Sequence, residues 1–109
     1  MNWKEFTDEA GLDAIKEASK TTTQVIFKHS TRCSISTMAK SRLERSEAPS
    51  NAEFNYLDLI AHRNISNKIA DDFTVEHASP QVLIIKNGEC IYDESHNAIS
   101  MDEIAEQVI

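Results

Sequence analysis

Short apolar runs alternate with amphipathic segments along almost the whole chain. Four of the runs are rich in β-branched and aromatic residues and have the length of buried strands. These predicted strands are Gln24–His29, Phe54–Leu59, Val82–Ile85 and Cys90–Tyr92. The last two flank Asn87-Gly88, a dipeptide that favours a two-residue hairpin turn. We therefore expect the third and fourth strands to be antiparallel neighbours.

Four other segments have apolar residues at helical spacing. Thr7-Asp8-Glu9 supplies a start for the first, with an N-cap and acidic residues in the first turn. Ser100 and Glu103 form a capping box before the last. The apolar positions are Leu12, Ile15 and Ala18; Ile35, Met38, Ala39 and Leu43; Ile65, Ile69 and Phe73; and Met101, Ile104, Ala105 and Val108.

The predicted order of elements is α-β-α-β-α-β-β-α. Strands joined through a helix pair in parallel, whereas the Asn87-Gly88 hairpin adds one antiparallel strand. The sequence thus predicts an α/β fold, a four-stranded mixed sheet with helices on both faces. This is the thioredoxin-like arrangement.

Composition narrows the range of functions. The 109 residues are 40% hydrophobic and 27% charged, which predicts one globular domain covering residues 1–109. A net charge of −7 argues against a nucleic-acid partner. Two cysteines are too few for a disulfide framework, and we do not expect a four-ligand zinc site. The sequence has neither an apolar signal segment nor a run of about 20 apolar residues, so we expect a cytoplasmic location and no membrane contact.

Cys33 is the candidate for chemistry. It lies in Thr31-Arg32-Cys33-Ser34-Ile35-Ser36, between the first predicted strand and the second predicted helix. The unpaired N–H groups and the dipole at a helix N-terminus favour a thiolate, and the charge of Arg32 adds to this. A lone cysteine is more often a small buried apolar residue. The polar neighbours of Cys33, including Ser34, favour an exposed nucleophile instead.

No second thiol is expected beside Cys33. Ser36 stands where many relatives with a Cys-x-x-Cys pair carry their second cysteine. Its hydroxyl can hydrogen-bond to the Cys33 sulfur, or it can be an ordinary polar residue of the first helical turn. Cys90 begins the return strand at the other end of the sheet, roughly 20 Å away at ~3.3 Å per residue. A disulfide between Cys33 and Cys90 within one chain is therefore not expected.

Two further segments are predicted to approach Cys33. Ser79-Pro80 opens the third strand, and in this topology we expect a cis peptide bond that exposes the Ser79 backbone to a substrate. The loop Glu94–Ala98 should return to the same end of the sheet. His96 then either contacts a substrate anion or is a solvated loop histidine. His29, His62 and His77 show no ligand spacing and are expected to be structural or exposed.

Together, Cys33-Ser34-Ile35-Ser36, Ser79-Pro80 and Ser95-His96 resemble the monothiol bacilliredoxins of the bacillithiol system. The resemblance covers nearly the whole chain. It implies a glutaredoxin-like thiol–disulfide oxidoreductase in which Cys33 removes bacillithiol from mixed disulfides on proteins, with Pro80 as the cis-proline. Bacillithiol is then a co-substrate, with no bound cofactor and no metal. We expect Arg32, the helix N-terminus and His96 to face the carboxylates of that thiol.

The expected partners are bacillithiolated proteins, a low-molecular-weight thiol and a disulfide reductase, with the protein itself a monomer. Two alternatives remain at this point. One is an electron-transfer protein in which a dimer holds an iron–sulfur cluster between two Cys33 thiolates. The chain lacks the Cys-Gly-Phe-Ser signature of cluster-carrying monothiol glutaredoxins. The other is a non-catalytic binding module on a thioredoxin scaffold.

Overall fold

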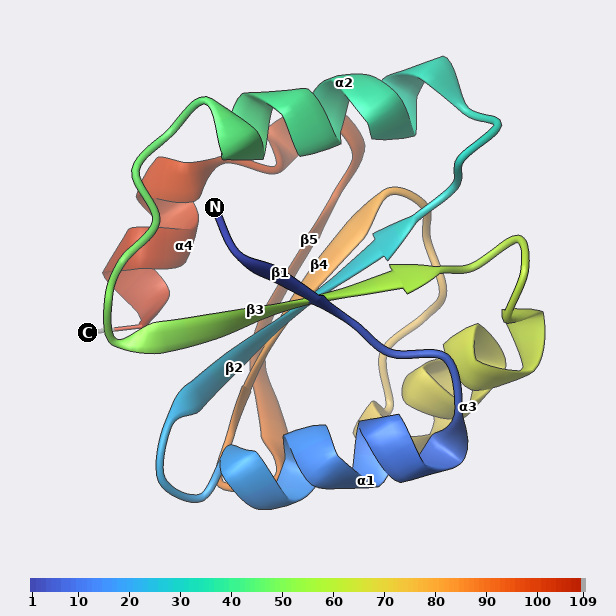
Figure 1. The fold of residues 1–109 in the computed structure, drawn as a ribbon, viewed down its shortest axis with the longest axis vertical. Helices are drawn as coiled ribbons and strands as arrows, with labels where there is room; N and C mark the ends of the chain where they lie inside the picture. The colour runs from blue at the N-terminus through green and yellow to red at the C-terminus, as the bar shows by residue number, and fades with distance from the viewer. Residues whose placement is uncertain (109) are drawn as a thin grey trace.

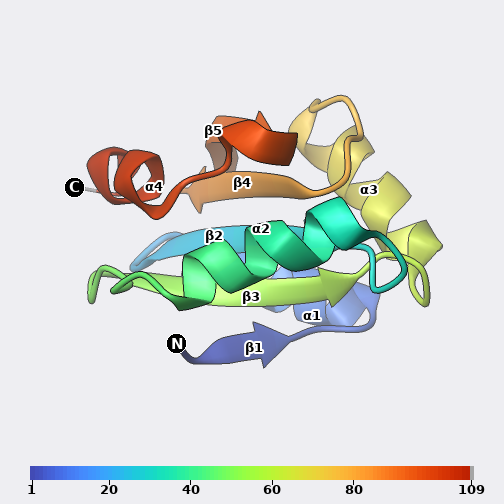
Figure 2. The ribbon, with the colours of Figure 1, turned by 90° about the horizontal axis from the view of Figure 1, so that it is seen from above.

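The computed structural model describes residues 1–108 and contains a single mixed β-sheet. The spatial order of its five strands is β1-β3-β2-β4-β5. Figure 2 shows them from edge to edge, with β1 and β5 outermost. Strands β1 and β3 run parallel to β2, whereas β4 runs antiparallel to both β2 and β5. The strands are β1 (Trp3–Glu5), β2 (Thr23–His29), β3 (Ala52–Asp58), β4 (Gln81–Lys86) and β5 (Glu89–Ser95).

The predicted thioredoxin-like fold is confirmed, but the predicted count of four strands is wrong by one. The additional strand is β1, which pairs in parallel with Phe54–Tyr56 of β3. Three residues are too few to show an alternation of apolar and polar positions, so the pattern gave no signal for it. Trp3 holds β1 in place by stacking on Phe27 with ring centroids 5.6 Å apart.

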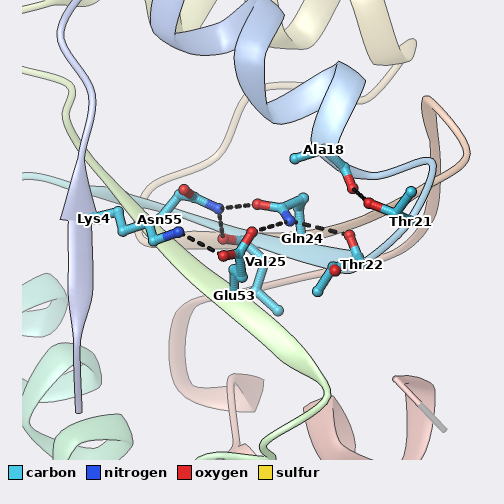
Figure 3. A network of polar contacts seen from close by, with 8 residues as sticks. All are labelled: Lys4, Ala18, Thr21, Thr22, Gln24, Val25, Glu53 and Asn55. Carbon is cyan, nitrogen blue, oxygen red and sulfur yellow. Dashed lines mark hydrogen bonds and ion pairs between the residues drawn. The ribbon is translucent and has the colours of Figure 1, made fainter.

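A polar network lies between β1 and the centre of the sheet (Figure 3). Lys4 Nζ donates to Glu53 Oε2 at 2.5 Å, and Gln24 Nε2 donates to Glu53 Oε1 at 2.7 Å. Asn55 Nδ2 donates to Gln24 Oε1 at 3.0 Å. Gln24 and Asn55 are buried, so these bonds satisfy amide groups that would otherwise be costly to remove from water. The network ties the short edge strand to its neighbours.

Helices cover both faces of the sheet, as predicted (Figures 1 and 2). One core, which includes Val25, Phe27 and Leu43, lies under α2 and α4. The other, which includes Leu12, Ile26 and Ile69, lies under α1 and α3. The helices are α1 (Glu9–Ala18), α2 (Ser34–Glu44), α3 (Arg63–Phe73) and α4 (Met101–Gln107), with a short 3₁₀ helix, η1 (His96–Ala98), before α4.

Caps and turns end these elements where the sequence predicts. Asp8 caps α1 by accepting from Gly11 N, and Ser100 caps α4 by accepting from Glu103 N. Asn87 and Gly88 have φ angles of 53° and 77°, the left-handed pair that a tight hairpin requires. None of the helices within residues 1–108 is long and apolar enough to cross a bilayer.

Strand directions determine which segments meet at each end of the sheet. Lys28 near the end of β2 pairs with Gln81 at the start of β4, and Gln81 pairs with Ser95 at the end of β5. The segments that precede α2, β4 and η1 therefore share one end of the sheet. The Asn87-Gly88 turn lies at the opposite end, where its N–H groups donate to Ser19.

Candidate active site

Cys33 is the N-cap residue of α2. Its backbone is extended, with φ −107° and ψ 122°, and its carbonyl accepts from Thr37 N at 3.0 Å. An N-cap side chain lies beside the first unpaired N–H groups of a helix, where negative charge is stabilised. The first turn of α2 holds no acidic residue. Cys33 is a half-exposed free thiol, so a reactant has access to it.

Arg32 and Ser34 flank Cys33, and both are exposed. Within residues 1–108 every ion pair is formed by a lysine, and the Arg32 guanidinium forms none. Its charge is free to interact with an anion at the entrance of α2. Ser34 makes no side-chain hydrogen bond among these residues.

Ser36 is turned away from solvent, and its hydroxyl bonds to groups other than the sulfur. It is completely buried, accepts from Ser30 N at 3.0 Å and lies 2.6 Å from His29 Nδ1. Since Ser30 N–H already donates to the oxygen, the hydroxyl proton is available for His29 Nδ1. Within residues 1–108 no hydrogen bond joins Ser36 to Cys33. Ser36 instead closes the loop before α2 onto the end of β2.

His29 belongs to this site, although its lack of ligand spacing predicted only a structural or exposed residue. Its ring is 6% exposed and lies between Phe27 and Tyr56, with both centroids 5.7 Å away. Burial, together with the positive charge of Lys40, lowers the pKa of His29. The neutral form of the imidazole is therefore favoured over the charged form. The signal in the sequence was strand alternation, because residues 25, 27 and 29 face α2.

The Ser79–Pro80 segment lies at the same end of the sheet as Cys33. The Ser79–Pro80 peptide bond is cis, and Pro80 O accepts from His96 N at 3.0 Å. The Ser79 hydroxyl is buried and has no hydrogen-bond partner within residues 1–108. His96 is exposed with φ 57°, and η1, which it begins, packs on α2. The predicted approach of residues 94–98 to this end is thus observed.

A buried lysine supports the segment before Pro80. Lys28 has no exposed surface, and its Nζ donates to Ser66 O at 3.1 Å and lies 3.4 Å from His77 Nδ1. No carboxylate pairs with it within residues 1–108, and burial lowers its pKa to about 8. The Gln81 side chain makes two hydrogen bonds to the same segment. Its Nε2 donates to Glu76 O, and its Oε1 accepts from Ala78 N. Sequence reasoning missed Lys28, because a lysine in a strand is usually an edge residue.

Cys90 lies at the other end of the sheet, as the hairpin predicts. It pairs with Ile85 beside the Asn87-Gly88 turn, and both cysteines are free. Its side chain is half-buried against the core under α1 and α3, and burial raises its pKa. Cys90 therefore packs in β5, where burial disfavours the thiolate form. Within residues 1–108 no three His, Cys, Asp or Glu side chains gather closely enough to hold a metal ion.

Comparison with known protein families shows which family this chain belongs to. The model of the family described as monothiol bacilliredoxin BrxC matches residues 4–104. The chain belongs to the monothiol bacilliredoxin family. The matched range contains the positions of Cys33, Ser36, the Ser79-Pro80 segment and His96.

Solved structures support the fold assignment for this bacilliredoxin family member. A proposed oxidoreductase with a thioredoxin fold superposes with a TM-score of 0.81 at 25% identity, covering 95% of this chain and 91% of that one. Thioredoxin from Fasciola hepatica gives 0.76 at 17% identity, covering 96% and 95%. Thioredoxin from Malassezia sympodialis gives 0.76 at 14% identity, covering 98% and 88%. The family and the first of these structures support a thiol–disulfide redox function.

Proposed function

We propose that this bacilliredoxin removes bacillithiol from mixed disulfides on proteins, with Cys33 as the only reacting thiol. The observation that carries the proposal is the position of Cys33: a half-exposed free thiol at the N-terminus of α2, at the same end of the sheet as the cis Ser79–Pro80 segment. The other cysteine, Cys90, lies near the start of β5 at the far end of the sheet. The second sulfur of each disulfide formed on Cys33 therefore comes from another molecule.

The reaction has two exchanges. In the first, the Cys33 thiolate attacks the bacillithiol sulfur of the mixed disulfide, a new Cys33–bacillithiol disulfide forms, and the substrate protein leaves as a thiolate that takes up a proton. In the second, the thiolate of another bacillithiol, or of a disulfide reductase, attacks the Cys33 adduct and releases Cys33. Each exchange conserves one disulfide. The disulfide that remains is bacillithiol disulfide or a mixed disulfide between bacillithiol and the reductase.

The surrounding groups have distinct parts in this proposal. The charge of Arg32 and the N–H groups of the first turn of α2, including that of Ser34, attract the anionic thiol. Ser36 acts indirectly, because its bonds to Ser30 N and His29 keep the loop before α2 in place. The Ser79 backbone pairs with the substrate beside Pro80, and His96 approaches from η1. We place the reaction in the reducing cytoplasm, where both thiols remain free, and we expect a monomer with no bound cofactor.

A substrate protein carrying one bacillithiol provides the test. We expect the wild type to release bacillithiol from it, and an adduct of one bacillithiol on Cys33 to appear in the intact mass when no second thiol is added. Cys33→Ser should lose at least about a hundredfold in rate, because the hydroxyl is a far weaker nucleophile than the thiolate. The matched control is Cys90→Ser, which should retain the wild-type rate.

Two results would contradict the proposal. One is an unmodified substrate after incubation with the wild type and a second thiol. The other is equal activity of Cys33→Ser and wild type. A parallel assay with the same protein modified by glutathione shows which small thiol the site prefers, and we expect the bacillithiol adduct to be processed faster.

A further inference from the structure

The outer side of α2 carries an exposed stripe that begins beside Cys33. Ile35, Met38, Arg42 and Arg45 recur at intervals of three and four residues, so they lie along one side of the helix. Ile35 is 45% exposed and Met38 63%, two of the most exposed large apolar side chains of residues 1–108. The opposite side, with Ser36, Ala39 and Leu43, is buried. In Figure 1, α2 lies along the upper edge of the molecule, with no other element above it.

The segment that carries this stripe has a charge opposite to that of the rest of the molecule. Residues 31–46 carry four basic side chains and one acidic, a net charge of +3, whereas the remaining residues carry −10. Lys40 pairs with Glu44 at 2.7 Å. Arg42 and Arg45 have no carboxylate partner within residues 1–108, although Arg42 also donates to Ile99 O at 3.0 Å. Arginines without a carboxylate partner in so acidic a chain are available to bind an external carboxylate.

A hollow connects the apolar and basic parts of the stripe. It has a volume of about 280 Å³ and is lined by Thr37, Met38, Ser41, Arg42 and Arg45. At ~1.5 Å per residue along a helix, Met38 lies roughly 7 Å and Arg45 roughly 18 Å beyond Cys33. An extended peptide advances ~3.3 Å per residue, so these positions correspond to about two and about five residues from a cysteine that reacts with Cys33.

We propose that this stripe docks the protein substrate. Its occupant is an extended acidic segment, with an apolar residue about two positions and carboxylates about four and five positions from the modified cysteine. The apolar residue packs on Ile35 and Met38, and the carboxylates bind Arg42 and Arg45. This inference rests on the proposed function, since it names the class of protein that Cys33 acts on. Substrates with basic segments at these positions are disfavoured by the same arginines.

Synthetic peptides that carry one cysteine as a mixed disulfide with bacillithiol test the proposal. One peptide has Leu at the second and Asp at the fourth and fifth positions after the cysteine, a second has the same residues before it, and each has a counterpart with Asn for Asp. We expect kcat/KM of the wild type to be about fivefold higher for the Asp form in one of the two directions. Arg45→Glu should remove this preference, and Met38→Ser should lower kcat/KM for both forms alike.

The matched control is Lys86→Glu, which makes the same charge change at an exposed position at the other end of the sheet. It should leave the preference intact. A small mixed disulfide without a peptide should be processed equally by the wild type and Arg45→Glu. If Asp and Asn peptides react alike in both directions, or if Lys86→Glu acts like Arg45→Glu, the docking proposal is wrong while the proposed function stands. If no peptide and no small disulfide reacts at Cys33, the proposed function itself fails.

Discussion

Burial of Lys28 carries a cost in folding free energy. Its side chain has no exposed surface, and its ammonium group faces a backbone carbonyl of α3 and His77, with no carboxylate beside it within residues 1–108. A buried charge without an opposite charge destabilises the folded state at pH values where it is protonated. The lowering of its pKa from 10.5 to about 8 corresponds to a cost of about 3 kcal/mol.

This cost makes stability depend on pH in a definite direction. Between pH 8 and 10.5 the unfolded chain holds the Lys28 proton more tightly than the folded protein does. The free energy of unfolding therefore increases as the pH rises through this range. We expect the difference between wild type and Lys28→Met to shift in favour of the wild type by up to about 3 kcal/mol from pH 7.5 to 10.5. Urea unfolding across that range measures it. If the free energies of unfolding of the two proteins change with pH in parallel, Lys28 does not titrate in this way.

Some features of the site follow from the sequence, whereas others depend on how the elements pack. The order of elements brings Cys33, the Ser79–Pro80 segment and His96 to one end of the sheet, because strand direction alone determines that. The bond between Ser36 and His29 could not be predicted, since it depends on how α2 packs against β2. Lys28 is a similar case, because its burial follows from the position of α3 rather than from its neighbours in sequence.

At the scale of elements, β1 depends on tertiary contacts. Its three residues gain little from pairing alone, and a short edge strand is normally marginal. Trp3 compensates by stacking on Phe27, by contacting Phe54 edge-on and by donating to Glu44 Oε2 at 2.8 Å. Lys40 Nζ lies 5.9 Å from the Trp3 ring centre, so α2 also contributes. The strand thus links the N-terminus to the helix that begins at Cys33.

Replacing Trp3 tests this account. We expect Trp3→Ala to lower the free energy of unfolding by about 2–3 kcal/mol, because a half-buried indole loses its packing and its hydrogen bond. Trp3→Phe should lose less than half of that, since it keeps the stacking on Phe27. Urea unfolding followed by circular dichroism gives both values. Equal losses for the two variants would mean that the hydrogen bond to Glu44, and not the stacking, holds β1.

The elements that the sequence predicted share one property. Each has either a hydrophobic period long enough to detect, as in α3 with Ile65, Ile69 and Phe73, or a specific local signal such as the Asn87-Gly88 turn. Strand β1 has neither, and η1 at His96–Ala98 is a single turn. Their structures arise from contacts with distant residues, which a pattern along the chain does not contain.

For the molecule as a whole, the salt concentration determines which charges act on a reactant at Cys33. Its extents are 31 × 30 × 23 Å, about the Debye length of ~30 Å in 0.01 M salt and well above the ~8 Å in 0.15 M salt. At low salt a reactant at Cys33 therefore experiences the whole net charge of −7. At physiological salt only nearby charges act, and Arg32 is the nearest charged neighbour in sequence. The sign of the field at the thiol should change between these conditions.

Alkylation of Cys33 by an anionic and a neutral reagent measures this change. We expect the ratio of the iodoacetate rate to the iodoacetamide rate to rise severalfold between 0.01 M and 0.15 M salt. Salt weakens the repulsion from distant acidic residues more than it weakens the attraction to nearby Arg32. Peptide mass analysis distinguishes Cys33 from Cys90. In Arg32→Gln the ratio at 0.15 M salt should fall below that of the wild type. A ratio that decreases steadily with salt in the wild type would mean that local positive charge dominates at every distance, so the acidic remainder of the molecule would have no influence on which reactants reach Cys33.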